Sequence, residues 1–397
     1  MLKILKKIYT LFKSGLTYAL YNIVYIKKNF KIKEGKYAIV NIDKQLKDDD
    51  LSRYFYIICM YLNNASYKVI VKADWREFKT FKKPYDFKRL LLKQSVIFVS
   101  NCSASVNTIV LMEPQTTNHI IHLSYGYHIT KSGKFNCVAN YPMYPVQYKF
   151  YKAPAFTSGV KKSNRNLKIF FAGDINEIKY GKEQIKKYFD VIPRLEVINF
   201  ILSNIWKSRK LENESGKSLL KQWLNSTDYV NEVIISEVKT KEEDWLKILS
   251  KTDFFICPPG VRIPWSHNCV EAMSAGAIPI LEYAELFYPK LENMKNCLSY
   301  TNYSELQMAI EKALAMEPSE IENMRKNVFN YYNDYLSIDS ITKEIKTFGN
   351  SAQKELKVAI PFIPTKQEWA AQIALYNPGF LKQIGLSRYR SSASPKP

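Results

Sequence analysis

The chain has 397 residues, of which 46% are hydrophobic and 13 are glycine, so it is long and apolar enough for two folded domains. This composition excludes an intrinsically disordered chain. A formal net charge of +21 favours a polyanionic partner, although a protein that is simply lysine-rich would show it too. The sequence has no zinc-finger spacing, no aromatic RNA-binding strand and no arginine-rich tail, so we do not expect nucleic acid to be that partner.

The cysteines lack the spacing of a metal site or a disulfide framework. The six cysteines stand at 59, 102, 137, 257, 269 and 297. None forms a CxxC pair, and several lie within apolar segments. We therefore expect buried free thiols in a reducing compartment, and a cytoplasmic protein.

Residues 1–30 form a basic segment that differs from the rest of the chain. Its uninterrupted apolar stretch, 15–26, has 12 residues, whereas a membrane span needs roughly 20. No small-residue cleavage site follows it, so we do not expect a signal peptide. One helical face would carry Leu2, Leu5, Tyr9 and Phe12, with lysines opposite. Such a helix either lies on the anionic inner face of the cytoplasmic membrane or packs on the protein's own N-terminal domain.

Strands alternate with helical segments in the first half of the chain, which indicates an α/β domain with a parallel, Rossmann-like sheet. Strands are expected at 37–42, 67–72, 96–99, 108–112 and 119–123, and helices at 51–62 and 76–93. Asp74 follows the second strand, and His128 follows the last one after a turn at 124–127. Both are candidate general bases because a cleft lies beyond the carboxyl ends of parallel strands. Asp74 could instead cap a helix, and His128 could be purely structural.

The second half repeats this alternation after a proline-containing linker at 141–166. Strands are expected at 167–172, 230–235, 253–257, 277–281 and 297–300, and helices at 182–189, 193–204, 242–249, 266–276 and 304–316. A nearly continuous helix is expected over 318–348. The sequence therefore predicts two α/β domains, at 31–155 and 167–349.

The stretch 251–282 is the most informative part of the chain. An apolar strand ends at Pro258-Pro259-Gly260, a short loop leads into a helix near Ser266, and a second apolar strand follows. In such a βαβ unit the loop lies at the carboxyl edge of the sheet, where ligands bind. The unpaired N–H groups at the helix start suit a diphosphate, and Glu271 could accept hydrogen bonds from ribose hydroxyls. Gly173, which ends the first strand of this domain, would let a ligand approach the backbone closely.

This stretch resembles the donor-site signature of GT-B glycosyltransferases, in its exostosin-type form. The matching residues are Cys257-Pro258, Gly260, Pro264-Trp265-Ser266, Glu271-Ala272, Gly276 and Ile278-Pro279. The resemblance covers about thirty residues and is specific for the superfamily, not for a sugar. It implies two Rossmann-like domains facing a cleft, with the tail 350–397 returning to the N-terminal domain. It also implies that the helix binds the donor diphosphate and that Glu271 contacts the ribose. The alternative is an ordinary βαβ crossover in which Glu271 is solvated and Trp265 packs.

The resemblance assigns chemistry to several side chains near this loop. Arg262 offers a planar fork to the diphosphate, and a neutral His267 could hydrogen-bond to phosphate. Lys179 and Lys182 could reach phosphate or be solvated. The helix dipole and basic side chains would stabilise the leaving group, so we expect no metal and no cofactor. We interpret the aspartates at 48–50 as a helix cap and not as a metal-binding D-x-D element.

Together these features predict a glycosyltransferase that uses a nucleotide-sugar donor and a glycan or lipid-linked acceptor. We expect metal-independent, inverting transfer in bacterial surface polysaccharide synthesis, such as lipopolysaccharide, O-antigen or capsule. One alternative is a transferase that uses a CMP-activated acidic sugar. Another is a catalytically inactive module, which would bind nucleotide or sugar without turnover.

Overall fold

The computed structural model describes residues 35–41, 52–72, 97–99, 108–112, 119–125, 136–151, 164–180, 184–261 and 263–360. The chain divides into two compact units. The first unit comprises 1–139 and 338–397, and the second comprises 140–337. Each unit is built on one β-sheet, so the prediction of two α/β domains is confirmed.

The first unit contains a seven-stranded sheet with the strand order β3-β2-β1-β4-β5-β13-β6. Its strands are β1 (Tyr37–Asn41), β2 (Lys68–Lys72), β3 (Ile97–Val99), β4 (Thr108–Met112), β5 (His119–Tyr125), β6 (Cys137–Val138) and β13 (Glu355–Ile360). Strand β13 pairs in parallel with both β5 and β6, although the 229 residues 126–354 separate it from β5 in sequence. The end of the described chain therefore completes the sheet of the first unit.

Strand β4 corrects the prediction of a wholly parallel first sheet. It runs antiparallel to both of its neighbours, β1 and β5. Six residues, 113–118, connect β4 to the adjacent β5. A parallel pair needs a crossover of about a dozen residues or more, so this connection permits only an antiparallel pair. The other strands of the sheet run in one direction.

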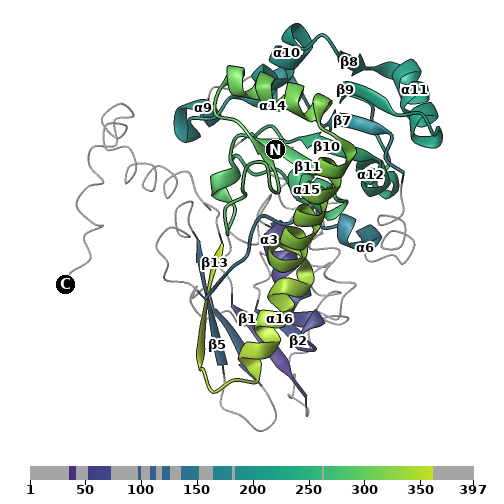
Figure 1. Ribbon diagram of the computed structural model, residues 1–397. Coiled ribbons are helices and arrows are strands. Elements are labelled where there is room, and N and C mark those ends of the chain that lie inside the picture. Colours follow the sequence, from purple (N-terminus) through teal and green to yellow (C-terminus); the bar gives the residue numbers. More distant parts are fainter. Residues whose placement is uncertain are drawn as a thin grey trace, which may run out of the picture. The chain divides into compact units, whose positions relative to one another are not determined.

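Two helices of the first unit pack against each other. Helix α3 (Ser52–Asn64) joins β1 to the parallel strand β2, and most of its side chains are buried. Helix α16 (Ile338–Gly349) lies alongside α3 (Figure 1). Its apolar side chains recur at helical spacing, with Ile341, Ile345 and Phe348 buried. The unit boundary therefore precedes α16, whereas the sequence placed this helix at the end of the second domain.

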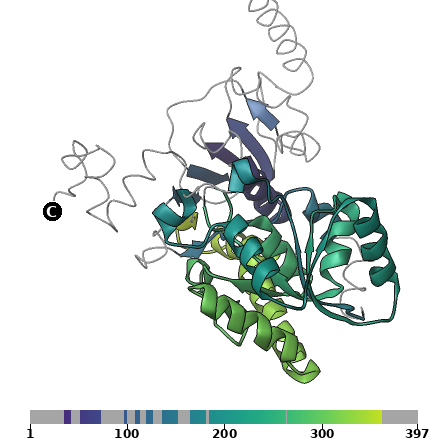
Figure 2. The same cartoon turned by 90° about the horizontal axis from the view of Figure 1, so that it is seen from above.

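The second unit contains a six-stranded, all-parallel sheet with the order β12-β11-β10-β7-β9-β8. Its strands are β7 (Leu167–Ala172), β8 (Ser208–Leu211), β9 (Val230–Ser236), β10 (Thr252–Ile256), β11 (Ile278–Leu281) and β12 (Leu298–Ser299). Its helices include α6 (Gln147–Tyr151), α8 (Glu177–Tyr180), α9 (Gln184–Phe189), α10 (Arg194–Asn204), α11 (Asn213–Asn225), α12 (Glu242–Leu249), α13 (His267–Ser274) and α14 (Tyr303–Ala315). Helices cover both faces of this sheet (Figures 1 and 2). Helix α10 packs with α14, and α12 packs with α13.

The strand β8 and the helix α11 were not predicted, because the segment 205–225 is rich in polar residues. Arg209 and Lys210 of β8 are exposed, which suits a strand at the edge of a sheet. The apolar strand β9 lies between β8 and β7 in the sheet, and its residues Val233 to Ser236 are buried. The order therefore departs from the Rossmann order, in which the second strand would pair with the first.

The long helix predicted for 318–348 is interrupted. Helix α15 (Pro318–Tyr331) runs into a π-helical turn, η4 (Tyr332–Leu336), and Ser337 adopts an extended conformation before α16. An ion pair anchors α15 to the sheet: the partly buried Arg325 binds the buried Asp253 of β10. Tyr229 also donates its hydroxyl hydrogen to Asp253. These contacts fix α15 to the second unit, while α16 belongs to the first.

Within the described residues, every cysteine is a free thiol, and four of the five are buried. Cys102 lies outside the described residues. No helix among the described residues is long and apolar enough to cross a membrane. The basic segment 1–30 and the aspartates at 48–50 also lie outside the described residues.

Candidate functional site

The topology of the second unit creates a switch point between β7 and β10. The chain leaves β7 towards β8 on one side of the sheet, and leaves β10 towards β11 on the other. Because parallel crossovers are right-handed, the helices that follow β7 and β10 lie on opposite faces. Ligands of open α/β sheets bind in the crevice that this divergence leaves at the carboxyl ends. The predicted donor loops follow these two strands.

The loop after β10 is tight and requires glycine. A Cβ atom at Gly260 would lie 2.6 Å from the carbonyl oxygen of Ile263 and 3.1 Å from that of Trp265. The Gly260 amide donates to the Pro264 carbonyl at 3.2 Å, which closes the turn. The Trp265 side chain is only 2% exposed, and its indole N–H donates to the Leu286 carbonyl at 3.2 Å. Trp265 therefore anchors the loop by packing, which is the alternative that the sequence left open for it.

Helix α13 begins where the sequence predicted. Ser266 is its N-cap residue, with extended backbone angles, but its side chain makes no capping hydrogen bond. His267 is the first helical residue, and its ring lies 5.5 Å from the ring of Tyr144, centroid to centroid. The helix start thus presents backbone N–H groups and the positive end of the helix dipole at the carboxyl edge of the sheet.

Gly173 lies next to the start of α13. The Asn268 side-chain amide donates to the Ala172 carbonyl at 3.2 Å, which joins the first turn of α13 to the end of β7. A Cβ atom at Gly173 would lie 3.5 Å from that amide nitrogen and 3.2 Å from the ring of Phe171. The structure therefore brings Gly173 next to Asn268 in the first turn of α13, although more than 90 residues separate the two in sequence.

The burial of Glu271 shows that the alternative of a solvated side chain is wrong, whereas the ribose contact stays a prediction. Glu271 is 1% exposed. Its Oε1 accepts a hydrogen bond from the Tyr144 backbone amide at 2.9 Å, and its Oε2 accepts one from the indole N–H of Trp245 at 2.6 Å. Both oxygens thus bind groups of the protein. The carboxylate joins α13 to α12 and to the segment that precedes α6.

Arg194 is a site residue that the sequence analysis missed. It is the first residue of α10 and is 6% exposed. Its Nε donates to the Pro259 carbonyl at 3.1 Å and its Nη1 to the Asp174 carbonyl at 3.2 Å, while the guanidinium lies 4.1 Å from the ring centroid of Tyr180. Burial lowers the pKa of Arg194. One buried cation therefore ties together the two loops that end β7 and β10, and no local motif in the sequence marks it.

The loop after Gly173 carries an exposed ion pair. Lys179 donates to Asp174 at 2.9 Å, and the Asn176 amide donates to the same carboxylate at 3.0 Å. Burial opposes ionisation of Asp174, but these two hydrogen bonds, together with the charges of Lys179 and Arg194, outweigh it and lower the pKa of the carboxyl. Lys179 is thus held beside the Gly173 loop. Lys182 lies outside the described residues.

Glu282 places a second carboxyl at this edge, directly after β11. Its Oε2 accepts a hydrogen bond from the Ile192 amide at 2.7 Å. Burial, reinforced by nearby Asp190, raises the pKa of Glu282 to about 7. A carboxyl with such a pKa can hold or release a proton near neutral pH.

This raised pKa makes stability depend on pH. The folded state favours protonated Glu282, so its contribution is complete below the unfolded pKa of 4.5 and is lost as the pH rises through about 7. We expect Glu282→Gln, which can still accept from Ile192, to raise the free energy of unfolding at pH 8 by on the order of 1–2 kcal/mol after solvent screening. At pH 4, below the unfolded pKa, the variant should match the wild type. Urea unfolding at the two pH values checks this, and an equal gain at both would refute the assignment.

Three predicted site residues, His128, Asp74 and Arg262, lie outside the described residues. Among the described residues, no group of three or more His, Cys, Asp or Glu side chains is arranged to hold a metal ion. The described site therefore rests on backbone groups of two loops and one helix, on buried Arg194, and on Glu282.

Comparisons with known proteins give structural similarities only. No protein-family model matches the chain, and a search of curated proteins finds no match. A glycosyltransferase structure from Rickettsia africae ESF-5 aligns with 79% of this chain and 99% of its own, at 10% identity and a TM-score of 0.42. The Anabaena protein HepE in complex with UDP-glucose aligns over the same shares, at 11% identity and a TM-score of 0.40. An E. coli trehalose-6-phosphate structure bound with UDP-2-fluoro glucose covers 76% of this chain and 72% of its own, at 10% identity and a TM-score of 0.31.

Proposed function

We propose that this protein is a GT-B glycosyltransferase whose second unit binds a nucleotide-sugar donor. The observation that carries the proposal is the meeting of Gly173 with the start of α13 at the switch point of an all-parallel sheet. A diphosphate binds well to the N–H groups and positive dipole end of a helix start and to a glycine backbone that it can approach closely. The exostosin-like run of residues lies in the same loop and helix.

The residues of the site take distinct roles in this proposal. The amides at the start of α13 and the Gly173 backbone hold the diphosphate, with Arg262 and His267 supplying side-chain contacts. Arg194 fixes the spacing of the two loops because it donates to a carbonyl of each. Glu271 acts as a positioning residue that orients α13 through its two buried hydrogen bonds.

Transfer itself requires the acceptor hydroxyl to attack the sugar carbon as the nucleotide diphosphate leaves. In the inverting reaction that we propose, a general base takes the hydroxyl proton, and His128 and Asp74 are the candidates. The helix dipole and basic side chains stabilise the leaving diphosphate without a metal ion. The net charge of +21 suits an acceptor that is an anionic glycan, or is linked to a lipid at the inner membrane surface, in bacterial surface polysaccharide synthesis.

Thermal melting with UDP, GDP, CMP and dTDP tests this proposal. A nucleotide at 100 times its dissociation constant should stabilise the folded chain by about 2.7 kcal/mol, and EDTA should not remove this effect. Release of nucleotide from the matching nucleotide-sugar then separates an enzyme from an inactive module, and a response to CMP alone would favour the CMP-sugar alternative. Stabilisation by none of the four nucleotides would refute the donor site, and loss with EDTA would refute metal independence.

A further inference from the structure

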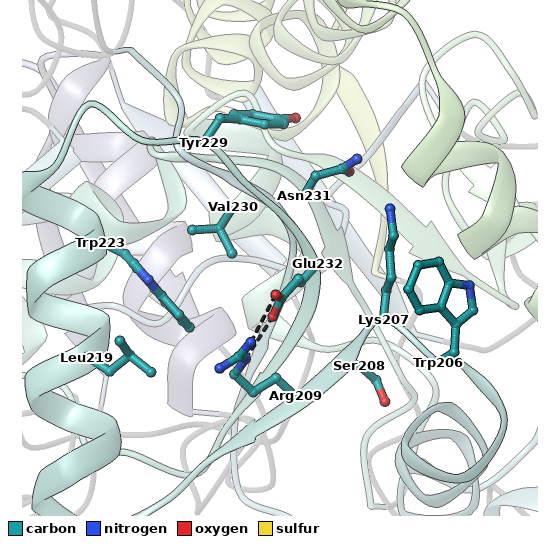
Figure 3. Close-up of a pocket in the computed structure, with 10 residues that line it drawn as sticks. All are labelled: Trp206, Lys207, Ser208, Arg209, Leu219, Trp223, Tyr229, Val230, Asn231 and Glu232. Atoms are coloured by element: carbon teal, nitrogen blue, oxygen red, sulfur yellow. Dashed lines mark hydrogen bonds and ion pairs between the residues drawn. The ribbon is translucent and has the colours of Figure 1, made fainter.

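A hollow in the second unit lies at the opposite edge of the sheet from the candidate donor site. Its volume is about 640 Å³. Its walls come from the start of β8, the start of β9 and helix α11 (Figure 3). These are the amino ends of the strands, whereas Gly173 and Gly260 follow the carboxyl ends of β7 and β10. The hollow is therefore separate from the loops described above.

Aromatic side chains form much of the lining. Trp206 is 86% exposed, and the Lys207 ammonium lies 4.9 Å from its ring centroid. Trp223 lies on the other side of Arg209, whose guanidinium is 5.8 Å from the indole centroid (Figure 3). Tyr229 borders the same hollow and is 46% exposed. An exposed tryptophan beside two further aromatic rings suits a binding surface, because the large apolar area of the rings gains from being covered.

Polar groups occupy the space between these rings. Arg209 donates to both carboxylate oxygens of Glu232, at 2.7 and 3.0 Å. The guanidinium has five N–H donors and the carboxylate about four acceptor positions, so this pair retains hydrogen-bonding capacity. Asn231 adds an amide that can both donate and accept. The hollow thus offers flat apolar faces beside paired donors and acceptors.

We infer that this hollow binds a saccharide chain. A pyranose ring has an apolar C–H face that stacks on an aromatic ring, and its hydroxyls need a donor and an acceptor close together. The lining carries three charged residues, Lys207, Arg209 and Glu232, of which the last two neutralise each other. This low charge does not suit a polyanionic nucleic acid, and insertion into a membrane would desolvate the ion pair.

The biological role of this saccharide site rests on the proposed function. In a glycosyltransferase, such a site would hold a distal part of the acceptor glycan while the acceptor end reaches the donor. Loss of stacking in Trp206→Ala should then raise the KM for a long acceptor and leave kcat and the KM for the donor unchanged. Saccharide binding itself is measured without turnover, so the hollow can be tested even if the donor site fails.

The test is binding of the purified full chain to an array of linear oligosaccharides that includes maltohexaose, cellohexaose and chitohexaose. The wild type should bind at least one oligosaccharide, and Trp206→Ala should weaken this binding about tenfold. Trp206→Tyr, which keeps a ring, should retain most of the binding. Met308→Ala, which removes an exposed apolar side chain on α14, serves as the matched control and should bind like the wild type. Stabilisation by the nucleotide that the melting experiment selects should be the same in all variants.

Four results would overturn the inference. The first is no binding of the wild type to any oligosaccharide on the array. The second is binding that Trp206→Ala leaves unchanged. The third is that Trp206→Ala changes only the binding to vesicles of phosphatidylglycerol with phosphatidylethanolamine, which would assign the surface to a membrane. A change only in the monomer–dimer equilibrium in sedimentation would equally overturn the inference and assign the surface to a second copy of the chain. If no nucleotide stabilises the wild type, the donor site is refuted, but the saccharide site in the hollow is not.

Discussion

Replacing Arg194 with leucine is expected to lower the free energy of unfolding by about 3–5 kcal/mol and the nucleotide affinity by about 10- to 100-fold. The stability falls because leucine leaves the buried Pro259 carbonyl without a donor and also removes the hydrogen bond to the carbonyl of the more exposed Asp174. The affinity falls because these carbonyls belong to the two loops that form the donor site. Urea unfolding gives the first quantity, and calorimetric titration with the nucleotide selected by melting gives the second.

Two further variants make this test specific. Arg194→Lys keeps the charge but lacks the planar fork that reaches both carbonyls. Its free energy of unfolding and its nucleotide affinity should therefore lie between those of Arg194→Leu and the wild type. Arg209→Leu removes an exposed arginine whose ion pair should be worth less than about 1 kcal/mol, and it should leave nucleotide affinity unchanged. A variant Arg194→Leu that stays folded and binds nucleotide like the wild type would contradict the role given to Arg194.

Glu271→Gln is expected to destabilise the second unit by about 2–4 kcal/mol. The wild-type carboxylate accepts from the Tyr144 amide and from the Trp245 indole, and both of these groups are donors. Glutamine has one acceptor oxygen, so its NH₂ group must face one of the two donors at a buried position. Chemical unfolding of the variant measures the loss.

A double-mutant cycle distinguishes this positioning role from a ribose contact. Trp245→Phe removes the indole N–H, so in its presence Glu271→Gln should cost much less than it does alone. Additive losses would contradict the hydrogen-bond arrangement. Unchanged stability combined with weaker nucleotide binding would show that Glu271 contacts the ribose, as the resemblance implies.

The unit β10–α13–β11 could be predicted from the sequence almost residue by residue. Its strands are continuous apolar runs, and Pro258, Gly260 and Gly276 mark the boundaries locally. Gly276 adopts a positive φ of 74°, and a Cβ atom there would clash with the ring of Phe329. Short-range patterns of this kind determine an element without knowledge of its neighbours.

The features that were missed depend on contacts between distant residues. Glu271 meets Tyr144 across 127 positions, and Arg194 meets Pro259 across 65. Nothing in the local pattern around Glu271 tells whether solvent, a ribose or an indole will face it. The antiparallel direction of β4 was also missed, but it does not depend on a distant contact. The six-residue connection to β5 already excluded a parallel pair. The length of that connection can be read from the sequence, whereas the burial of Glu271 cannot.

The claim that the donor diphosphate binds at the start of α13, next to Gly173, is tested most directly by NMR. Amide resonances of the isotope-labelled full chain would be followed while the nucleotide selected by melting is added. The largest shifts are expected at Gly173, His267 and Asn268, with little change at Val230 and Asn231 on the opposite edge of the sheet. Shifts concentrated away from Gly173 and the start of α13, with these amides unmoved at saturation, would contradict it.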